Sequence, residues 1–197
     1  MKLRNIFLLF SIFCASLTSC AQEIPYKEQQ IKAAVMAAPE DLREGATVLG
    51  YDADGNVVTL REGTNNLICL ADNPNQKGYN CACYHQDLSD FMARGRALKA
   101  EGKNRQEVFD MREAEVKGGT LKMPENPSTL HILYGGDEVY NVETGVVEGA
   151  KYRYVVYIPY ATAESTGLPL EPIVPGGPWI MDPGTHRAHI MITPVNQ

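Results

Sequence analysis

Three of the five cysteines and one of the four histidines fall in one short stretch, residues 69 to 85, CLADNPNQKGYNCACYH. If the end of this stretch is extended, alternate side chains point to one face, so Cys81, Cys83 and His85 project together. Cys69 could then complete a Cys₃His set of the kind that holds zinc tetrahedrally. One interpretation is therefore a zinc site, although the C-x-C spacing is tighter than the spacing usual between paired zinc ligands.

The same cysteines can instead form a disulfide, from Cys69 to either Cys81 or Cys83. Closing a loop of about 15 residues in this way stabilises a fold by roughly 3 kcal/mol in the chain-entropy model. A third interpretation is a reactive thiol. Cys83 precedes a helix start predicted near Asp87, where the helix dipole lowers a thiol pKa, and His85 could act as its base. The spacing alone leaves all three interpretations open.

The remaining histidines and the single tryptophan are further candidates. His186 and His189 would share a helix face, but residues 190–192 are Ile-Met-Ile and indicate a strand, in which positions three apart point to opposite faces. We therefore expect no shared metal ion and interpret His189 as a hydrogen-bonded strand histidine. His131 lies in another predicted strand without a partner in the sequence. Trp179, in a proline-rich segment, is a candidate for binding a ligand together with His131 and His189.

The start of the chain indicates export. Lys2 and Arg4 precede an apolar run over residues 6 to 15, which is too short for a membrane span of about 20 residues. The sequence LTSC, which ends at Cys20, is similar to a bacterial lipobox. We therefore expect residues 1–19 to be a lipoprotein signal peptide and Cys20 to carry acyl chains such as palmitate, which anchor the protein to a membrane.

The residues after Cys20 are Ala-Gln-Glu-Ile, without an aspartate directly after the cysteine. By resemblance to the sorting rules of Gram-negative lipoproteins, this favours the outer membrane, with the domain facing the periplasm. That compartment is oxidising, so neighbouring thiols tend to pair, which favours a disulfide over a zinc site.

Composition narrows the function classes. The formal net charge is −6, with 24 acidic and 18 basic side chains, so the surface as a whole repels nucleic acids and we expect no nucleic-acid partner. The sequence has no G-x-S-x-G, H-E-x-x-H, P-loop or G-x-G-x-x-G motif. Whether the chain is an enzyme therefore stays open.

The first half of the chain predicts a helix followed by strands. Residues 24–38 have apolar side chains at helical spacing, and Pro39 ends that helix. Two alternating runs around Asp54-Gly55 predict a β-hairpin, and residues 65–70 predict a third strand. We assign residues 20–40 to the lipid anchor and N-terminal helix.

The second half predicts two helices and then more strands. Asp87 is the expected cap of the first helix, and Asn104 with Glu107 forms a capping-box pattern for the second. Strands are expected over 128–136, 151–160 and 188–194, and a long loop over 166–184. The expected fold is a single α+β domain over residues 41–197, with a mainly antiparallel sheet and N-terminal and central helices.

Several blocks of the sequence resemble a family of uncharacterised secreted bacterial proteins. They are LREGTN at 60–65, Cys69, Cys83, GGPWIM at 176–181, Gly184-Thr185 and AHIM at 188–191. The resemblance implies a domain type and an extracytoplasmic location, with no activity attached. Cys69, Cys83 and His189 coincide with the pattern of this family.

Cys81, His85 and His186 do not coincide with that pattern, and Leu67 stands where the relatives tend to carry tryptophan. The resemblance therefore implies a Cys69–Cys83 disulfide with Cys81 as a surplus thiol.

The expected function is that of a lipid-anchored envelope protein, a binding or structural module with a protein or small-molecule partner. The alternative is a Cys/His-based metal-binding protein or enzyme of the periplasm. No cofactor is expected, and zinc is the alternative.

Overall fold

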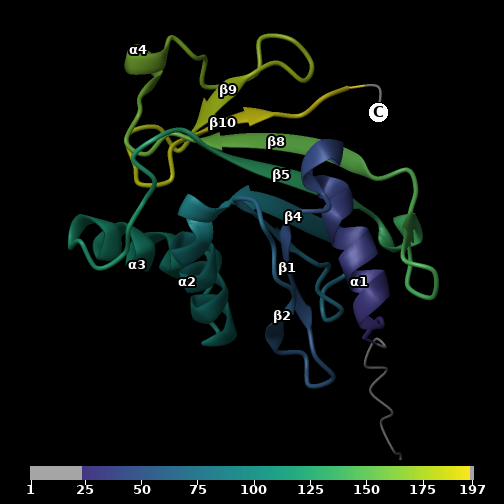
Figure 1. Ribbon diagram of the computed structural model, residues 1–197. Helices are drawn as coiled ribbons and strands as arrows, with labels where there is room; N and C mark the ends of the chain where they lie inside the picture. The colour runs from purple at the N-terminus through teal and green to yellow at the C-terminus, as the bar shows by residue number, and fades with distance from the viewer. Residues whose placement is uncertain (1–23, 196–197) are drawn as a thin grey trace, which may run out of the picture.

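A computed structural model describes residues 24–195 (Figure 1). Its helical elements are α1 (Lys27–Ala34), η1 (Val35–Ala37), η2 (Glu40–Leu42), η3 (Gln86–Leu88), α2 (Ser89–Ala100), α3 (Arg105–Lys117), η4 (Asp137–Val139) and α4 (Ala163–Thr166). Its strands are β1 (Thr47–Tyr51), β2 (Val57–Arg61), β3 (Leu67–Leu70), β4 (Tyr79–His85), β5 (Ser128–Gly135), β6 (Tyr140–Asn141), β7 (Val146–Val147), β8 (Lys151–Tyr157), β9 (Trp179–Met181) and β10 (His189–Ile192). This content confirms the predicted α+β class.

One sheet of eight strands organises the domain, in the order β2-β1-β3-β4-β5-β8-β10-β9. Its neighbours are antiparallel except for β1 and β3, which run parallel. The hairpin predicted at Asp54-Gly55 joins β1 to β2, with Gly55 at a φ of 79° that suits glycine. β6 and β7 form a separate small hairpin.

Helix α1 and the turn η1 cover one face of the sheet (Figure 1). Ala33, Ala34 and Ala37 are buried there, because their small side chains let the helix backbone approach the strands closely. The Tyr79 hydroxyl donates to the Ala33 carbonyl oxygen at 3.0 Å, which ties β4 to the helix. The helix begins at Lys27, three residues later than the sequence predicts, and ends before Pro39 as expected.

Helices α2 and α3 pack against the opposite face (Figure 1). The predicted capping box is present: the Asn104 side chain accepts from the backbone N–H of Glu107, whose carboxylate accepts from the Asn104 N–H. Phe91 and Leu98 are buried, which contributes about 1.5–3 kcal/mol for each side chain. The prediction that Asp87 caps the first helix is wrong, because Asp87 lies inside η3 and α2 begins at Ser89.

The strands after α3 alternate between the two faces. Tyr152 and Tyr154 stack on the α1 side at a ring-centroid distance of 5.9 Å, while Arg153, Val155 and Tyr157 face α2 and α3. The expectation of an uninterrupted loop over 166–184 is wrong, because residues 179–181 pair with β10 as the edge strand β9. The proline-rich part of the segment precedes this strand.

The predicted signal peptide (1–19) and the lipidation site Cys20 lie outside the described residues. Within residues 24–195, no helix has both the length and the apolar character needed to span a membrane.

Candidate functional site

A groove of about 440 Å³ lies between the sheet and the helix pair α2–α3. We call it the basic groove and define it by its lining residues: Leu70, Asn80, Ala82, Tyr84, Phe91, Met92, Gly95, Arg96, Lys99, Arg105, Val108, Arg112, Leu130, Ile132, Arg153, Val155, Tyr157, Met181, Arg187, His189 and Met191. Its volume is in the range of small-molecule sites. Strands β4, β5, β8 and β10 form its floor, and the two helices form its wall.

The middle of the floor is apolar. Strand register places Leu130, Val155 and Met191 side by side across β5, β8 and β10. Met92 of α2 and Val108 of α3 face this row from the helices. A ligand in the groove would therefore contact hydrocarbon along its central part.

The charge of the groove is opposite to that of the chain as a whole. Its lining contains five arginines, one lysine and one histidine, and none of the described residues that line it is acidic. The complete sequence has a net charge of −6. Within residues 24–195, Arg187 is the one lining cation that forms an ion pair, with Asp182 at 2.6 Å. The groove thus concentrates uncompensated positive charge.

Arg112 is the most buried of these cations, with 8% of its surface exposed. Its guanidinium lies over the Phe91 ring, 3.8 Å from the centroid, and Nη1 donates to the Phe91 carbonyl oxygen at 3.2 Å. Its Nε is buried and has no hydrogen-bond partner among the described residues. Burial disfavours the charged form and lowers the pKa of Arg112 to about 10, so the side chain is still a cation at neutral pH.

Gly95 makes room for this arginine. A Cβ atom added at Gly95 would lie 2.9 Å from Nη1 of Arg112, closer than such contacts normally allow. Glycine within a helix costs about 1 kcal/mol relative to alanine. The close approach of the Arg112 guanidinium from α3 therefore explains why a glycine lies in the middle of α2.

Arg153 lies farther along the floor, on β8. Its guanidinium lies over the Tyr134 ring at 4.6 Å from the centroid, and its Nε is also buried without a hydrogen-bond partner in the described range. Arg96 donates to the Tyr84 hydroxyl at 3.4 Å. Arg96 and Lys99 also line a second cavity of about 420 Å³, which adjoins the groove at Leu70.

His189 lines the groove beside Arg187, as part of β10. Its Nδ1 contacts the Arg187 carbonyl oxygen at 2.6 Å, in keeping with the predicted hydrogen-bonded strand histidine. Burial lowers the pKa of His189, so its ring is neutral at pH 7. The positive charge of the groove therefore comes from arginine and lysine and does not vary near neutral pH.

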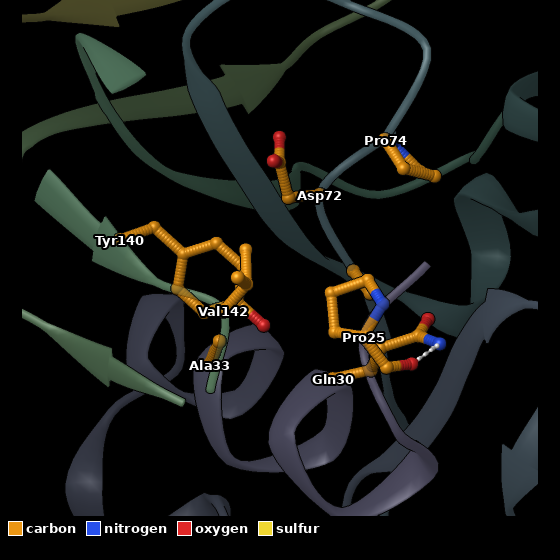
Figure 2. A pocket seen from close by; sticks show the side chains of 8 residues that line it. Pro25, Gln30, Ala33, Asp72, Pro74, Tyr140 and Val142 are labelled. Carbon is orange, nitrogen blue, oxygen red and sulfur yellow. Dashed lines mark hydrogen bonds between the residues drawn. The ribbon is translucent and has the colours of Figure 1, made fainter. Parts of the chain in front are cut away.

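A much smaller cavity lies between α1, the β3–β4 loop and the β6–β7 hairpin (Figure 2). Its volume is about 10 Å³, enough for one water molecule, and it is lined by Gln30, Asp72 and Tyr140 among others. Burial raises the pKa of Asp72 to about 6, and its carboxylate accepts from the Asn80 N–H at 2.8 Å. This cavity is too small for an organic ligand.

The cysteine stretch forms a disulfide between Cys69 and Cys83, which face each other in the β3–β4 register. Cys81 is a free, fully buried thiol on the same face, and burial raises its pKa to about 12. With the bridge intact, Cys83 is neither a thiolate ligand nor a nucleophile.

His85 contacts Asn66 through Nε2 and accepts from the Asp87 N–H through Nδ1, so both ring nitrogens are engaged. Among residues 24–195, no group of three or more His, Cys, Asp or Glu side chains is arranged to hold a metal ion.

The other candidates from the sequence are separated from one another. His131 lies on the α1 side of the sheet, with its ring 5.7 Å from that of Tyr154, and therefore faces away from the groove. Trp179 is on the edge strand β9 and does not line the groove, whereas its neighbour Met181 does. Of the three predicted ligand-binding residues, His189 alone lies in the groove.

His186 is fully buried behind the groove wall. Its Nδ1 and its backbone N–H both contact the Glu113 carboxylate of α3, and Lys117 pairs with the same carboxylate at 2.7 Å. Desolvation opposes ionisation of Glu113, but Lys117 and His186 outweigh it and lower the pKa to about 2. This contact fixes the loop before β10 to the helix that carries Arg112.

None of the arginines is among the residues that the sequence motifs indicate, although the sequence contains a signal for them. Arg105, Val108 and Arg112 recur at the spacing of one helix face, so arginine occupies positions where an apolar residue is expected. Arg153 likewise alternates with Val155 and Tyr157 on the inward face of its strand. A basic residue at an inward position of an apolar pattern is the feature that would have indicated the groove.

Comparisons with family models, curated proteins and solved structures found no match for this chain. The resemblance to a family of secreted bacterial proteins therefore stays a prediction.

Proposed function

We propose that this chain is an envelope binding protein that holds a small anionic ligand with an apolar body in the basic groove. The observation that carries the proposal is the lining of the groove, which combines five arginines and a lysine with no acidic side chain. The sequence similar to a lipobox at Cys20 supports attachment to a membrane through lipid, with the outer membrane as the favoured site.

Arg112 supports an anion as the ligand. A buried cation without a counter-ion destabilises a fold, and such groups concentrate at functional sites. Guanidinium also recognises carboxylate and phosphate groups through two parallel hydrogen bonds, which gives both charge and geometry. A bound anion would therefore supply the partner that Arg112 lacks among residues 24–195.

The apolar floor and the size of the groove support an amphiphile. Leu130, Val155 and Met191 would bury the hydrocarbon of such a ligand, at about 25 cal/mol per Å² of apolar surface removed from water. A small hydrophilic anion such as inorganic phosphate would leave this row in contact with water. The volume of about 440 Å³ fits one small molecule.

Calorimetric titration of the purified protein tests the proposal. The probes are decanoate and decyl phosphate, with decanol and decyltrimethylammonium as neutral and cationic molecules of the same chain length. We expect the two anions to bind, with affinity that falls as salt rises, and the neutral and cationic probes to bind at least tenfold more weakly. Equal affinity for decanoate and decanol would overturn the proposal.

Two matched variants locate the site. Arg112→Met retains most of the side-chain volume, removes the charge and should weaken decanoate binding by about 10- to 100-fold, the range of one or two charge-assisted hydrogen bonds. Arg94→Met is the control, because Arg94 is on the same helix pair but is held by Glu115 outside the groove. If both variants bind like the wild type, the anion is bound elsewhere and the proposal fails.

A further inference from the structure

Arg112 and Arg153, the two lining arginines whose buried Nε has no hydrogen-bond partner among the described residues, lie at two ends of the apolar floor. Arg153 and Tyr157 are on the same face of β8, four residues apart, which corresponds to about 13 Å along a strand. Arg112 belongs to the Tyr157 end, because its guanidinium covers Phe91, whose ring is 5.5 Å from that of Tyr157. The Arg153 guanidinium lies away from the Tyr157 end, over the Tyr134 ring.

The side chains whose charge acts on the Arg112 guanidinium are those of Tyr157, Arg187 and Glu115. Arg187 lines the same end of the groove as His189. We call this the Arg112 end and the other the Arg153 end, defined by those two arginines.

Val155 lies between the two ends, with Leu130 and Met191 beside it in the neighbouring strands. This row offers no polar side chain to a ligand. A molecule that lies along β8 would thus meet a guanidinium, then hydrocarbon, then a second guanidinium.

We infer that the ligand of the basic groove is a dianion, with two acidic groups at opposite ends of an apolar chain of about ten carbon atoms in all. The inference rests on the proposed function and specifies its ligand class. An α,ω-dicarboxylate has this chemistry. A monoanion with its head at Arg112 would place its apolar end beside the Arg153 guanidinium, whose buried Nε would still lack a partner.

Titration with decanedioate, its monomethyl ester and decanoate tests the inference on the same purified protein. The three share one chain length and differ in the group at the far end, which is charged in decanedioate alone. We expect decanedioate to bind at least tenfold more tightly than the other two at constant ionic strength. The monomethyl ester and decanoate should bind alike, because neither carries a second charge.

Arg153→Met should remove the preference of the protein for decanedioate over decanoate. Arg112→Met should weaken all three ligands. Arg43→Met is a control outside the groove, since its guanidinium donates to the Ala38 carbonyl oxygen near η1. If Arg153→Met does not fold, Arg153→Lys is titrated in its place. We expect this variant to prefer decanedioate over decanoate less strongly than the wild type does.

Equal binding of decanoate and decanedioate by the wild type would overturn the dianion inference and leave the proposed function standing. A preference for decanedioate that survives Arg153→Met would also overturn it. If none of the three ligands binds and decyl phosphate does not bind either, the proposed function itself fails.

Discussion

Replacement of Arg112 by methionine should make the protein more stable and at the same time a poorer binder. Arg112 is a buried cation whose structural partners are the Phe91 ring and one backbone carbonyl oxygen. Methionine keeps the unbranched stem and can place its sulfur against the same ring. The substitution therefore removes the charge with little change in packing.

The size of the effect follows from the shifted pKa. A pKa of about 10 in place of 12.5 corresponds to a destabilisation of about 3 kcal/mol at neutral pH, since one pH unit is worth about 1.4 kcal/mol. The lost cation–π contact and charged hydrogen bond offset about 1 to 2 kcal/mol of this. We expect the free energy of unfolding to rise by about 1 to 2 kcal/mol, or about 2–8 °C in Tm for a domain of this size.

Guanidinium chloride unfolding followed by circular dichroism, with the disulfide intact, measures this change for Arg112→Met against wild type. Arg94→Met serves as the control: Arg94 is partly exposed and pairs with two glutamates, so its loss should lower stability by less than about 1 kcal/mol. A drop of 2 kcal/mol or more for Arg112→Met would refute the reasoning, because Arg112 would then be a structural residue and not one held ready for an anion.

The remaining predictions concern the bridge, the buried carboxyl and the glycine. Reduction of Cys69–Cys83, which spans 14 residues, should lower the free energy of unfolding by about 3 kcal/mol, as chemical unfolding with and without reductant will show; an unchanged midpoint would contradict this. The pKa of Asp72 is raised by burial to about 6, so its contribution to stability is complete below pH 4 and lost as pH rises through 6. Asp72→Asn should therefore stabilise the protein by about 1 kcal/mol at pH 7.5, after allowance for partial exposure, and not at pH 4, measured by unfolding at both values. Gly95→Ala should displace the Arg112 guanidinium and weaken decanoate binding about tenfold with little change in Tm; unchanged affinity in calorimetry would show that the close contact is dispensable.

The elements that depend on local chemistry could be predicted from the sequence. The capping box of Asn104, the turn at Asp54-Gly55 and the helix that ends before Pro39 each rest on residues adjacent in the chain. The strand at Trp179 could not be predicted in this way, because its hydrogen bonds come from β10 and the residues that flank it are rich in proline and glycine. A local sequence pattern does not show which strand of the sheet a segment will pair with.

The groove could not be predicted from the sequence either, because its lining residues are far apart in the chain. Arg112 and Arg153 are 41 positions apart and line one groove from α3 and β8, whose packing against each other the sequence does not define. The cysteines show the converse, because the pairing of β3 with β4 places Cys69 opposite Cys83 within a single hairpin. The sequence alone does not distinguish Cys81 from Cys83 as the partner of Cys69. The strand register selects Cys83.

That register has a consequence for how the chain reaches its native state. Cys81 and Cys83 are both buried on the α1 side of β4, so a two-residue slip of β3 would bring Cys69 opposite Cys81 without turning any side chain to the wrong face. A one-residue slip would turn apolar side chains to the wrong face of the sheet and is therefore disfavoured. A two-residue slip keeps each side chain on its face, so the alternating pattern does not disfavour it. Oxidation before β4 has docked on β5 would then trap a misregistered hairpin, and thiol exchange would have to undo it. Cys81 is thus a source of mispaired disulfides during folding, and Cys81→Ala should raise the yield of protein with the Cys69–Cys83 bridge.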